Sequence, residues 1–519
     1  MSAEFVEDDL PGSSLSNLQE QQVPPGVPAH PILYQVNTRV LLARLGRVLG
    51  RPAGFDDIPD EALQEIVDLG FDWVWFLGVW QTGAAARSIS RNEAGWQGSF
   101  LEALPDLLPE DISGSPFAIA AFHADTAFGG NAALQRLRLR VNRAGLRLML
   151  DFVPNHVAPD HQWVMEKPSL FMQGSETILA EDPQNWLRVQ TGLGMLVLAH
   201  GRDPYFPGWP DTVQLDYANP ETQSAMSDVL LDIGGRCDGV RCDMAMLLLP
   251  DVFERCWSGQ MNGRHMASFW TSAIPRLREA HPDFRLLAEV YWGLEPTLLE
   301  QGFDFAYDKG LYDGLRAPDA GRVRALLAVD GDHGRHLARF LENHDEPRAA
   351  AVFPLQQHKA AAVLTFCAPG LRLFHQGQLE GARVHIPIHL NRGPVEPLDP
   401  AIHEFYMDLL SVLRDPVLRD GTFAALSVAP AWEGNPSHEA FTASIWSDES
   451  GPRLLCVTNY RADRGQCRVH LVHASLSGRV VLLSDRLGPE HYAREGDMLA
   501  TEGLYLDLPG WGYNLFEIG

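Results

Sequence analysis

The chain has 519 residues, of which 45% are apolar and 21% are charged, and its formal net charge at pH 7 is −26. A chain of this length is too long for one ordinary domain, and its composition is typical of a soluble globular protein. Because so negative a molecule repels phosphate backbones and anionic lipid, we expect no nucleic acid and no membrane among its partners. A neutral substrate is compatible with this charge.

Residues 1–30 are polar and acidic and end in several prolines, which predicts a flexible N-terminal arm. The first residues, MSAEFVEDDLPGSS, contain no apolar stretch of the kind found in signal peptides. The six cysteines form no Cys-x-x-Cys pair, so buried free thiols are expected rather than a metal site. These features together favour a reducing cytoplasm as the location.

From residue 31 onwards, short apolar runs alternate with longer amphipathic stretches such as Ala132–Ala144. Continuous apolar strands followed by helices predict parallel strands that are buried on both faces. About eight such units close a barrel, so we predict an eight-stranded parallel β/α (TIM) barrel over residues 31–400, with an open doubly wound sheet as the alternative. The predicted strands are Ile32–Asn37, Trp73–Val79, Arg147–Val153, Gly239–Ala245, Arg285–Tyr291, Phe303–Asp308, Arg339–His344 and Leu371–Gln376.

Two segments depart from this alternation. The long connection after the third strand, residues 156–216, is rich in proline, glycine and aromatic residues, which predicts a short inserted subdomain. Residues 401–519 begin with a helical pattern, Ala401–Leu413, and continue with short alternating runs. We therefore predict a linking helix and a C-terminal all-β domain of the sandwich type. Its clearest strands are Ala440–Trp446, Arg453–Asn459 and Cys467–Val472.

Ionisable side chains occur at or just past the C-terminal ends of the predicted barrel strands. A β/α barrel builds its active site on that rim, and a lone carboxylate is costly to bury inside a strand. The pattern therefore predicts a catalytic rim rather than a set of structural ion pairs. The residues concerned are Asp151, His156, Asp243, Glu289, His344, Asp345 and His375.

Four of these strand ends can be compared with a known family. In order along the chain, the segments DFVPNH, GVRCD, AEVYW and ENHD resemble the four signature segments of the α-amylase family, glycoside hydrolase family 13. The stretches YQVNTR, GSPF and DYANP agree with this resemblance, which covers roughly residues 31–390. The four signature segments are Asp151–His156, Gly239–Asp243, Ala288–Trp292 and Glu342–Asp345.

The resemblance implies a retaining glycosidase that uses a pair of carboxyl groups about 5–5.5 Å apart. Asp243 matches the family's nucleophile, Glu289 its general acid/base and Asp345 its third carboxylate. Further matches imply substrate-binding roles for His156, His344 and Arg241, the last of which would keep Asp243 ionised and oriented.

Two aromatic residues are added as substrate-binding candidates. Trp292 is one of several tryptophans that either stack on sugar faces or pack in the protein. Phe122 stands where many family members carry a tyrosine, and it retains the ring for stacking but lacks the hydroxyl. Asp151 is left open between structural hydrogen bonding and sugar contact.

The segment after the nucleophile departs from the calcium-dependent members of the family. Those members continue with a Lys-His pair, whereas Met244–Leu247 are apolar here. The change removes a metal ligand and a sugar contact, so we expect no cofactor and no metal, and calcium is not supported.

The leading hypothesis is a retaining hydrolase acting on α-glucosidic bonds of short oligosaccharides or α-glucans. A transglycosylase of the same family differs only in whether a sugar or water reaches the glycosyl-enzyme intermediate. A non-catalytic sugar-binding barrel is a further alternative. A metal-dependent barrel hydrolase is disfavoured, because it would need paired histidines such as His-x-His at an early strand end.

Overall fold

The computed structural model describes residues 27–328 and 331–519. The flexible arm predicted for residues 1–30 therefore lies outside the described residues, except for its last four positions. Within those four, His30 is 2% exposed, and its backbone N–H donates to the Arg419 carbonyl at 2.9 Å. The end of the predicted arm is thus part of the folded domain.

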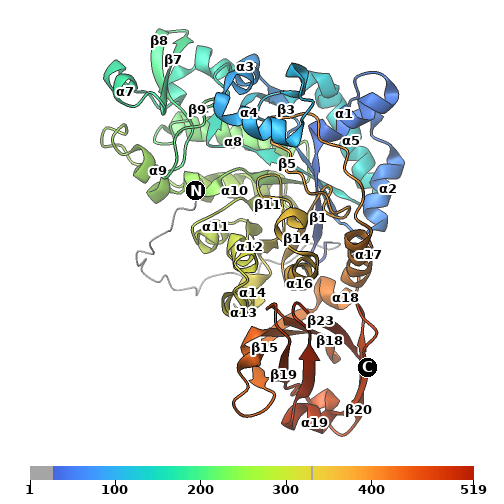
Figure 1. The fold of residues 1–519 in the computed structure, drawn as a ribbon. Coiled ribbons are helices and arrows are strands. Elements are labelled where there is room, and N and C mark those ends of the chain that lie inside the picture. The colour runs from blue at the N-terminus through green and yellow to red at the C-terminus, as the bar shows by residue number, and fades with distance from the viewer. Residues whose placement is uncertain (1–26, 329–330) are drawn as a thin grey trace.

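Eight parallel strands close into a barrel in the order β1-β14-β13-β12-β11-β10-β5-β2 (Figure 1). Because β1 pairs with β14 on one side and with β2 on the other, the predicted barrel is confirmed and the doubly wound alternative is wrong. The strands are β1 (Ile32–Asn37), β2 (Trp73–Leu77), β5 (Arg147–Phe152), β10 (Gly239–Cys242), β11 (Arg285–Ala288), β12 (Phe305–Tyr307), β13 (Leu337–Arg339) and β14 (Leu371–His375).

One predicted strand, Arg339–His344, is displaced, since β13 ends where that prediction begins. The pairing with β14 runs through Ala338 and Arg339 and then stops. Phe340 is 2% exposed because its ring packs on Tyr307 with centroids 5.2 Å apart, and not because it belongs to the ladder. Burial in a coil segment gives the same apolar pattern as burial in a strand.

Helices surround the barrel. In α5 (Gly130–Ala144) the buried residues Leu134, Leu137 and Val141 recur at helical spacing, so one face packs on the barrel while the basic residues between them face outwards. Gly145 ends α5 with φ 97°, a conformation that glycine adopts without steric cost. The others that follow barrel strands are α1 (Thr38–Leu49), α2 (Asp60–Asp68), α8 (Pro220–Gly234), α9 (Pro250–Trp257), α10 (Trp270–Ala280), α11 (Glu295–Glu300), α12 (Lys309–Arg316), α13 (Ala320–Leu327), α14 (Gly331–Gly334), α15 (Ala349–Val352) and α16 (Leu355–Phe366).

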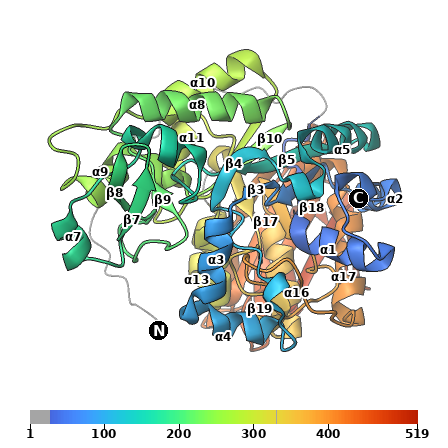
Figure 2. The ribbon, with the colours of Figure 1, turned by 90° about the horizontal axis from the view of Figure 1, so that it is seen from above.

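Two excursions leave the barrel before β10. Between β2 and β5, the pair β3 (Trp80–Thr82) and β4 (Ile119–Ala124) flanks α3 (Ala84–Asn92) and α4 (Ala94–Ala103). The segment predicted as an inserted subdomain contains further short elements, and its β7–β8 hairpin lies on the opposite side of the barrel from α2 and α5 in the view from above (Figure 2). These elements are β6 (His156–Val157), α6 (Gln162–Glu166), α7 (Glu176–Glu181), β7 (Trp186–Thr191), β8 (Gly194–Ala199) and β9 (Val213–Gln214).

Helices α17 (Pro400–Leu413) and α18 (Pro416–Asp420) lead into two antiparallel sheets, β15-β17-β18-β23-β20-β21 and β16-β19-β22. Apolar side chains of both sheets form one buried cluster, as in a β-sandwich. The C-terminal all-β domain is thereby confirmed. Its strands are β15 (Thr422–Leu426), β16 (Val428–Pro430), β17 (Phe441–Asp448), β18 (Gly451–Asn459), β19 (Gly465–Val469), β20 (Val480–Asp485), β21 (His491–Glu495), β22 (Leu504–Leu508) and β23 (Tyr513–Ile518), with α19 (Gly496–Thr501) between β21 and β22.

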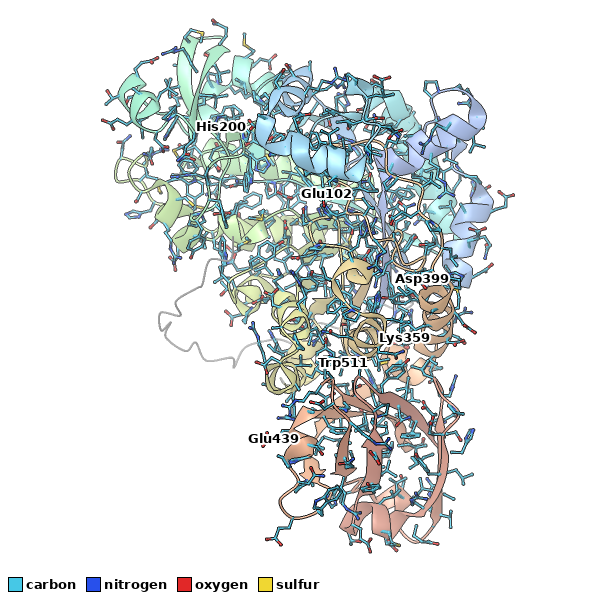
Figure 3. The ribbon with its side chains drawn as sticks, in the orientation of Figure 1. Glu102, His200, Lys359, Asp399, Glu439 and Trp511 are labelled. Atoms are coloured by element: carbon cyan, nitrogen blue, oxygen red, sulfur yellow. The ribbon has the colours of Figure 1, made fainter. Side chains whose placement is uncertain are left out.

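The C-terminal sheets are docked on the barrel through buried aromatic residues. Trp446 on β17 is fully buried and donates its indole N–H to the Cys367 carbonyl, just past α16, at 2.8 Å. Tyr460 donates its hydroxyl to the Leu315 carbonyl of α12 at 2.7 Å and packs against Trp511, which lies at the junction (Figure 3). Among the described residues, no helix is long and apolar enough to cross a membrane.

Candidate active site

The predicted nucleophile and the predicted acid/base each come directly after one of two neighbouring strands. Cys242 of β10 and Ala288 of β11 are partners in the parallel ladder, so Asp243 and Glu289 emerge side by side at the carboxyl-terminal rim. Both are buried, with 5% and 2% of their surface exposed. The two backbones are also hydrogen-bonded at this point, since the Glu289 N–H donates to the Cys242 carbonyl at 3.1 Å.

Arg241 joins these two carboxyl groups. It lies two residues before Asp243 and therefore on the same face of β10. Its Nη1 is 2.6 Å from Asp243 Oδ1, and its Nη2 is 2.6 Å from Glu289 Oε2. Burial by itself would lower the pKa of Arg241, but Glu289 and Asp243 raise it well above its ordinary value. The guanidinium thus stays charged in a site where it is 1% exposed.

Glu289 has the environment of a proton donor. Burial raises the pKa of its carboxyl group above the ordinary value, and the nearby Asp243 raises it too. Arg241, the Met244 N–H at 2.7 Å and the Tyr291 hydroxyl at 2.8 Å act in the opposite direction. A buried carboxyl group with a raised pKa is the form that general-acid catalysis requires.

Asp345 is the most open of the three carboxyl groups, with 38% of its side chain exposed. Its Oδ2 lies 3.1 Å from His344 Nε2 and 3.9 Å from Arg241 Nη2. Removal from bulk water and the negative charge of Glu289 raise the pKa of Asp345 well above its ordinary value. The structure therefore brings Asp243, Glu289 and Asp345 together around one guanidinium.

Two of the predicted sugar-binding residues are histidines beside this cluster. His344 is buried, which lowers its pKa, and its Nδ1 lies 2.7 Å from Gln35 Nε2. Its other ring nitrogen, Nε2, is the one next to Asp345. The pKa of His156 is likewise lowered by burial, against the opposing charge of Asp243, and its ring packs on Trp209 at 5.1 Å.

Phe117 and Trp75, rather than Phe122, place aromatic rings against Arg241 and His344. Phe117 stands 5.1 Å from the guanidinium carbon of Arg241, and its ring centroid is 5.4 Å from that of His344. In the described part of the chain, the ring contacts of Phe122 are with Phe152 and His161. Sequence reasoning missed Phe117, although the GSPF segment that carries it was a signal.

Trp292 follows the acid/base by three residues and adopts an unusual backbone conformation, with φ 65°. A bulky residue takes this conformation only where its surroundings hold it there. Its ring lies edge-on to Tyr205 of the inserted segment, with centroids 5.0 Å apart. The structure thus places Trp292 against the inserted segment, and its contact with a sugar stays a prediction.

Asp151 and Asn155 are already satisfied by protein donors. Asp151 accepts hydrogen bonds from the Trp75 indole at 3.0 Å and from the Gly78 N–H at 2.7 Å, which favours the structural alternative. Burial raises the pKa of its carboxyl group to about 7. Asn155 Oδ1 accepts from Gln214 Nε2 at 3.0 Å. Within residues 27–328 and 331–519, no three His, Cys, Asp or Glu side chains gather as a set of metal ligands.

This barrel, with three carboxyl groups and a buried arginine on its rim, has the architecture of a glycosidase-type β/α barrel. Residues 117–300 match the family model described as the α-amylase catalytic domain. This match confirms the resemblance to the α-amylase family that was drawn from the four segments.

Similar proteins agree on the family and the fold. An α-glucosidase of Culex pipiens is 21% identical over 393 residues, which are 67% of this chain and 62% of that protein. Maltase 1 of Drosophila virilis is 21% identical over 400 residues, which are 67% of this chain and 58% of that protein. The chain thus spans less than two thirds of the length of these relatives.

Solved structures share the whole fold at low identity. A maltogenic α-amylase from Thermotoga neapolitana has a TM-score of 0.66 at 17% identity, covering 94% of this chain and 98% of its own. An α-amylase from Lactobacillus plantarum has a TM-score of 0.64 at 21% identity, covering 94% and 99%. A trehalulose synthase variant has a TM-score of 0.65 at 15% identity, covering 95% and 99%.

Proposed function

We propose that this protein is a retaining glycosidase that cleaves α-glucosidic bonds of short oligosaccharides or α-glucans through a covalent glycosyl-enzyme intermediate. The observation that carries the proposal is the bridge made by Arg241, whose two terminal nitrogens bind Asp243 and Glu289 at 2.6 Å each. Two carboxyl groups held by one guanidinium lie close together. Retention requires carboxyl groups about 5–5.5 Å apart, with no room for a water between nucleophile and sugar, and the shared guanidinium supports such a pairing.

Each site residue has its own role in the two steps of the proposed reaction. Asp243 attacks the anomeric carbon while Glu289 gives its proton to the leaving oxygen, and a β-linked glycosyl ester forms on Asp243. Glu289, now ionised, takes a proton from water, and the resulting hydroxide oxygen displaces Asp243 from the sugar. Arg241 binds and orients Asp243, and Asp345 faces the positive charge that develops on the ring in both transition states.

The alternative outcome is transfer to a sugar hydroxyl in place of water, which uses the same intermediate and the same residues. A non-catalytic barrel has no evident use for a buried acid with a raised pKa beside an arginine-bound carboxylate. We also infer a cytoplasmic location, because all six cysteines are free and five of them are buried.

The test is the anomeric form of the first product. With an aryl α-glucoside as substrate, proton NMR should show α-glucose before mutarotation produces the β-anomer. If the β-anomer appears first, the enzyme is inverting and Asp243 is not the nucleophile. If neither this substrate nor a panel of maltose, trehalose, sucrose, isomaltose and maltodextrins yields any product, the proposed function is wrong.

A further inference from the structure

The turn that carries Asp345 has no regular secondary structure between β13 and α15. Asn343 shapes its tip, because its side-chain oxygen accepts the backbone N–H groups of Asp345 and Glu346, each at 2.9 Å. His385 supports the turn from outside by donating from Nε2 to the His344 carbonyl at 2.9 Å. These bonds define the local shape of the turn, and the contact of the His344 ring with Gln35 of β1 at 2.7 Å attaches its tip to the barrel.

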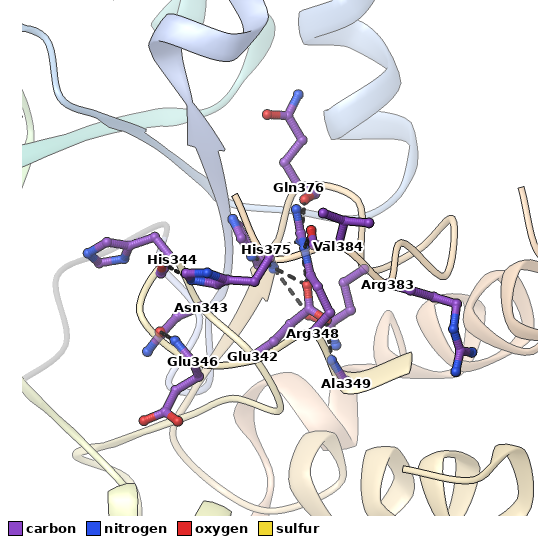
Figure 4. Close-up of polar contacts among 12 residues, drawn as sticks. Glu342, Asn343, His344, Glu346, Arg348, Ala349, His375, Gln376, Arg383 and Val384 are labelled. Atoms are coloured by element: carbon purple, nitrogen blue, oxygen red, sulfur yellow. Dashed lines mark hydrogen bonds and ion pairs between the residues drawn. The ribbon is translucent and has the colours of Figure 1, made fainter. Parts of the chain in front are cut away.

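A buried carboxylate connects the two ends of this turn by hydrogen bonds. Glu342, which is fully buried, accepts Arg348 Nη1 on Oε1 and the Ala349 N–H on Oε2, each at 2.7 Å (Figure 4). Residue 342 precedes the turn and residues 348 and 349 follow it, so one side chain ties its two ends together. We call Glu342 and Arg348 the clamp.

The clamp is attached to the last barrel strand. Arg348 Nη1 also donates to the Gln376 carbonyl at 2.8 Å, just past β14, and Arg348 Nε donates to the Val384 carbonyl at 3.3 Å. His375 Nδ1 lies 3.3 Å from Glu342 Oε1. Burial opposes ionisation of Glu342, but Arg348 and His375 bring the pKa of its carboxyl group to about 2. The clamp therefore keeps its charge over the whole range in which a glycosidase works.

Asp345 itself has little direct support. Its contacts with His344 at 3.1 Å and Arg241 at 3.9 Å are few, and more than a third of its side chain is exposed. Its place opposite Asp243 and Glu289 is therefore set by the backbone of the turn. A misplacement of about 1 Å in such a group costs about 10²-fold in rate.

We propose that Glu342 and Arg348 are positioning residues that act through Asp345, by clamping the ends of the turn that holds it against Arg241. The inference rests on the proposed function for its catalytic consequence, whereas the clamp itself is a property of the fold. Neither residue touches the substrate in this assignment.

The test compares Glu342→Gln with a matched control, Asp304→Asn. Asp304 is also buried and also accepts a guanidinium and a backbone amide, from Arg285 Nη1 and the Leu286 N–H, each at 2.8 Å. A second guanidinium, Arg278 Nη2, donates to it at 3.2 Å. It precedes β12, at the rim opposite the active site. Each variant breaks a buried pair of the same kind, so both should lose comparable thermal stability, and only Glu342→Gln should affect the turn.

The first readout is hydrogen–deuterium exchange at a temperature where all variants are folded. Exchange of the amides in residues 343–348 should rise in Glu342→Gln and stay at the wild-type level in Asp304→Asn. Unchanged exchange in Glu342→Gln would overturn the proposal. This measurement needs no substrate, so it decides on the clamp even if the wild-type protein releases no glucose and the proposed function fails.

The second readout is a double-mutant cycle on kcat with an aryl α-glucoside. Glu342→Gln should lower kcat by about 10²-fold, and Asp304→Asn should lower it by less than about twofold. When Asp345→Asn is already present, adding Glu342→Gln should lower kcat by less than a further factor of about three. Positioning through Asp345 would be refuted if Glu342→Gln lowered kcat by the same factor with and without Asp345→Asn. It would also be refuted if Asp304→Asn lowered kcat as much as Glu342→Gln. If Glu342→Gln does not fold, Arg348→Lys, which keeps the buried carboxylate paired, takes its place in both measurements.

Discussion

Replacing Arg241 by methionine should destabilise the protein in a pH-dependent way. Methionine fills much of the same volume without charge, so Asp243 and Glu289 would lose their common partner at 5% and 2% exposure. Breaking a buried ion pair costs about 3–5 kcal/mol, because the remaining charge is left without compensation. Since two carboxyl groups lose their partner here, we expect the upper end of that range at neutral pH.

The expected fall in melting temperature is the loss of unfolding free energy divided by the unfolding entropy. That entropy is about 2.1 cal/mol/K per residue near 60 °C. For 519 residues unfolding as one unit, it amounts to about 1.1 kcal/mol/K. A loss of about 5 kcal/mol should therefore lower Tm by about 5 °C.

The sign of the pH dependence follows from Glu289. Burial raises the pKa of its carboxyl group, and Arg241 opposes that rise. Without Arg241 the folded-state pKa moves further above the unfolded-state value of about 4.3. The additional destabilisation is then absent below the folded-state pKa of Glu289 in the wild type, grows as the pH rises towards its folded-state pKa in the variant and is constant above that value.

The assay is calorimetry of the wild type and Arg241→Met at pH 4 and pH 7.5. The difference in Tm should be small at pH 4 and reach about 5 °C at pH 7.5. Arg136→Met is the control, because its pair with Asp56 is more than half exposed on both sides and should contribute little at either pH. A difference in Tm for Arg241→Met that is the same at both pH values would refute the reasoning.

Two further predictions concern catalysis. Asp243→Asn should lower kcat by several orders of magnitude with the fold intact, because an amide cannot form the glycosyl ester; near-normal turnover by the folded variant, checked by circular dichroism, would contradict the assignment. Treatment with EDTA should leave both activity and Tm unchanged, because apolar residues follow Asp243 and Asn155 is bonded to Gln214; a large loss restored by calcium alone would show that a metal site exists.

The sequence by itself determined the barrel, the C-terminal sheets and the rim position of the three carboxyl groups. The physical reason is that parallel strands of a barrel all point the same way, so ionisable residues at successive strand ends must meet at one rim. Asp243 and Glu289 could be placed together because β10 and β11 are consecutive and adjacent in the barrel. For the same reason, the four segments could be compared with a family although 48 residues separate Arg241 from Glu289.

Only the tertiary structure decided which side chains touch. Apolar burial alone did not distinguish β13 from the coil after it, because Phe340 is buried by a ring contact with Tyr307 and not by strand pairing. The sequence pattern could not show that Phe117, which precedes β4, reaches Arg241, whereas Phe122 of β4 contacts Phe152 and His161.

The clamp depends in the same way on three-dimensional proximity. Glu342 and Arg348 come from the coil between β13 and α15, His375 ends β14, and the pairing of β13 with β14 brings them together. Local sequence patterns encode which face of an element is buried. The partners that meet there are set by the packing of elements distant in the chain.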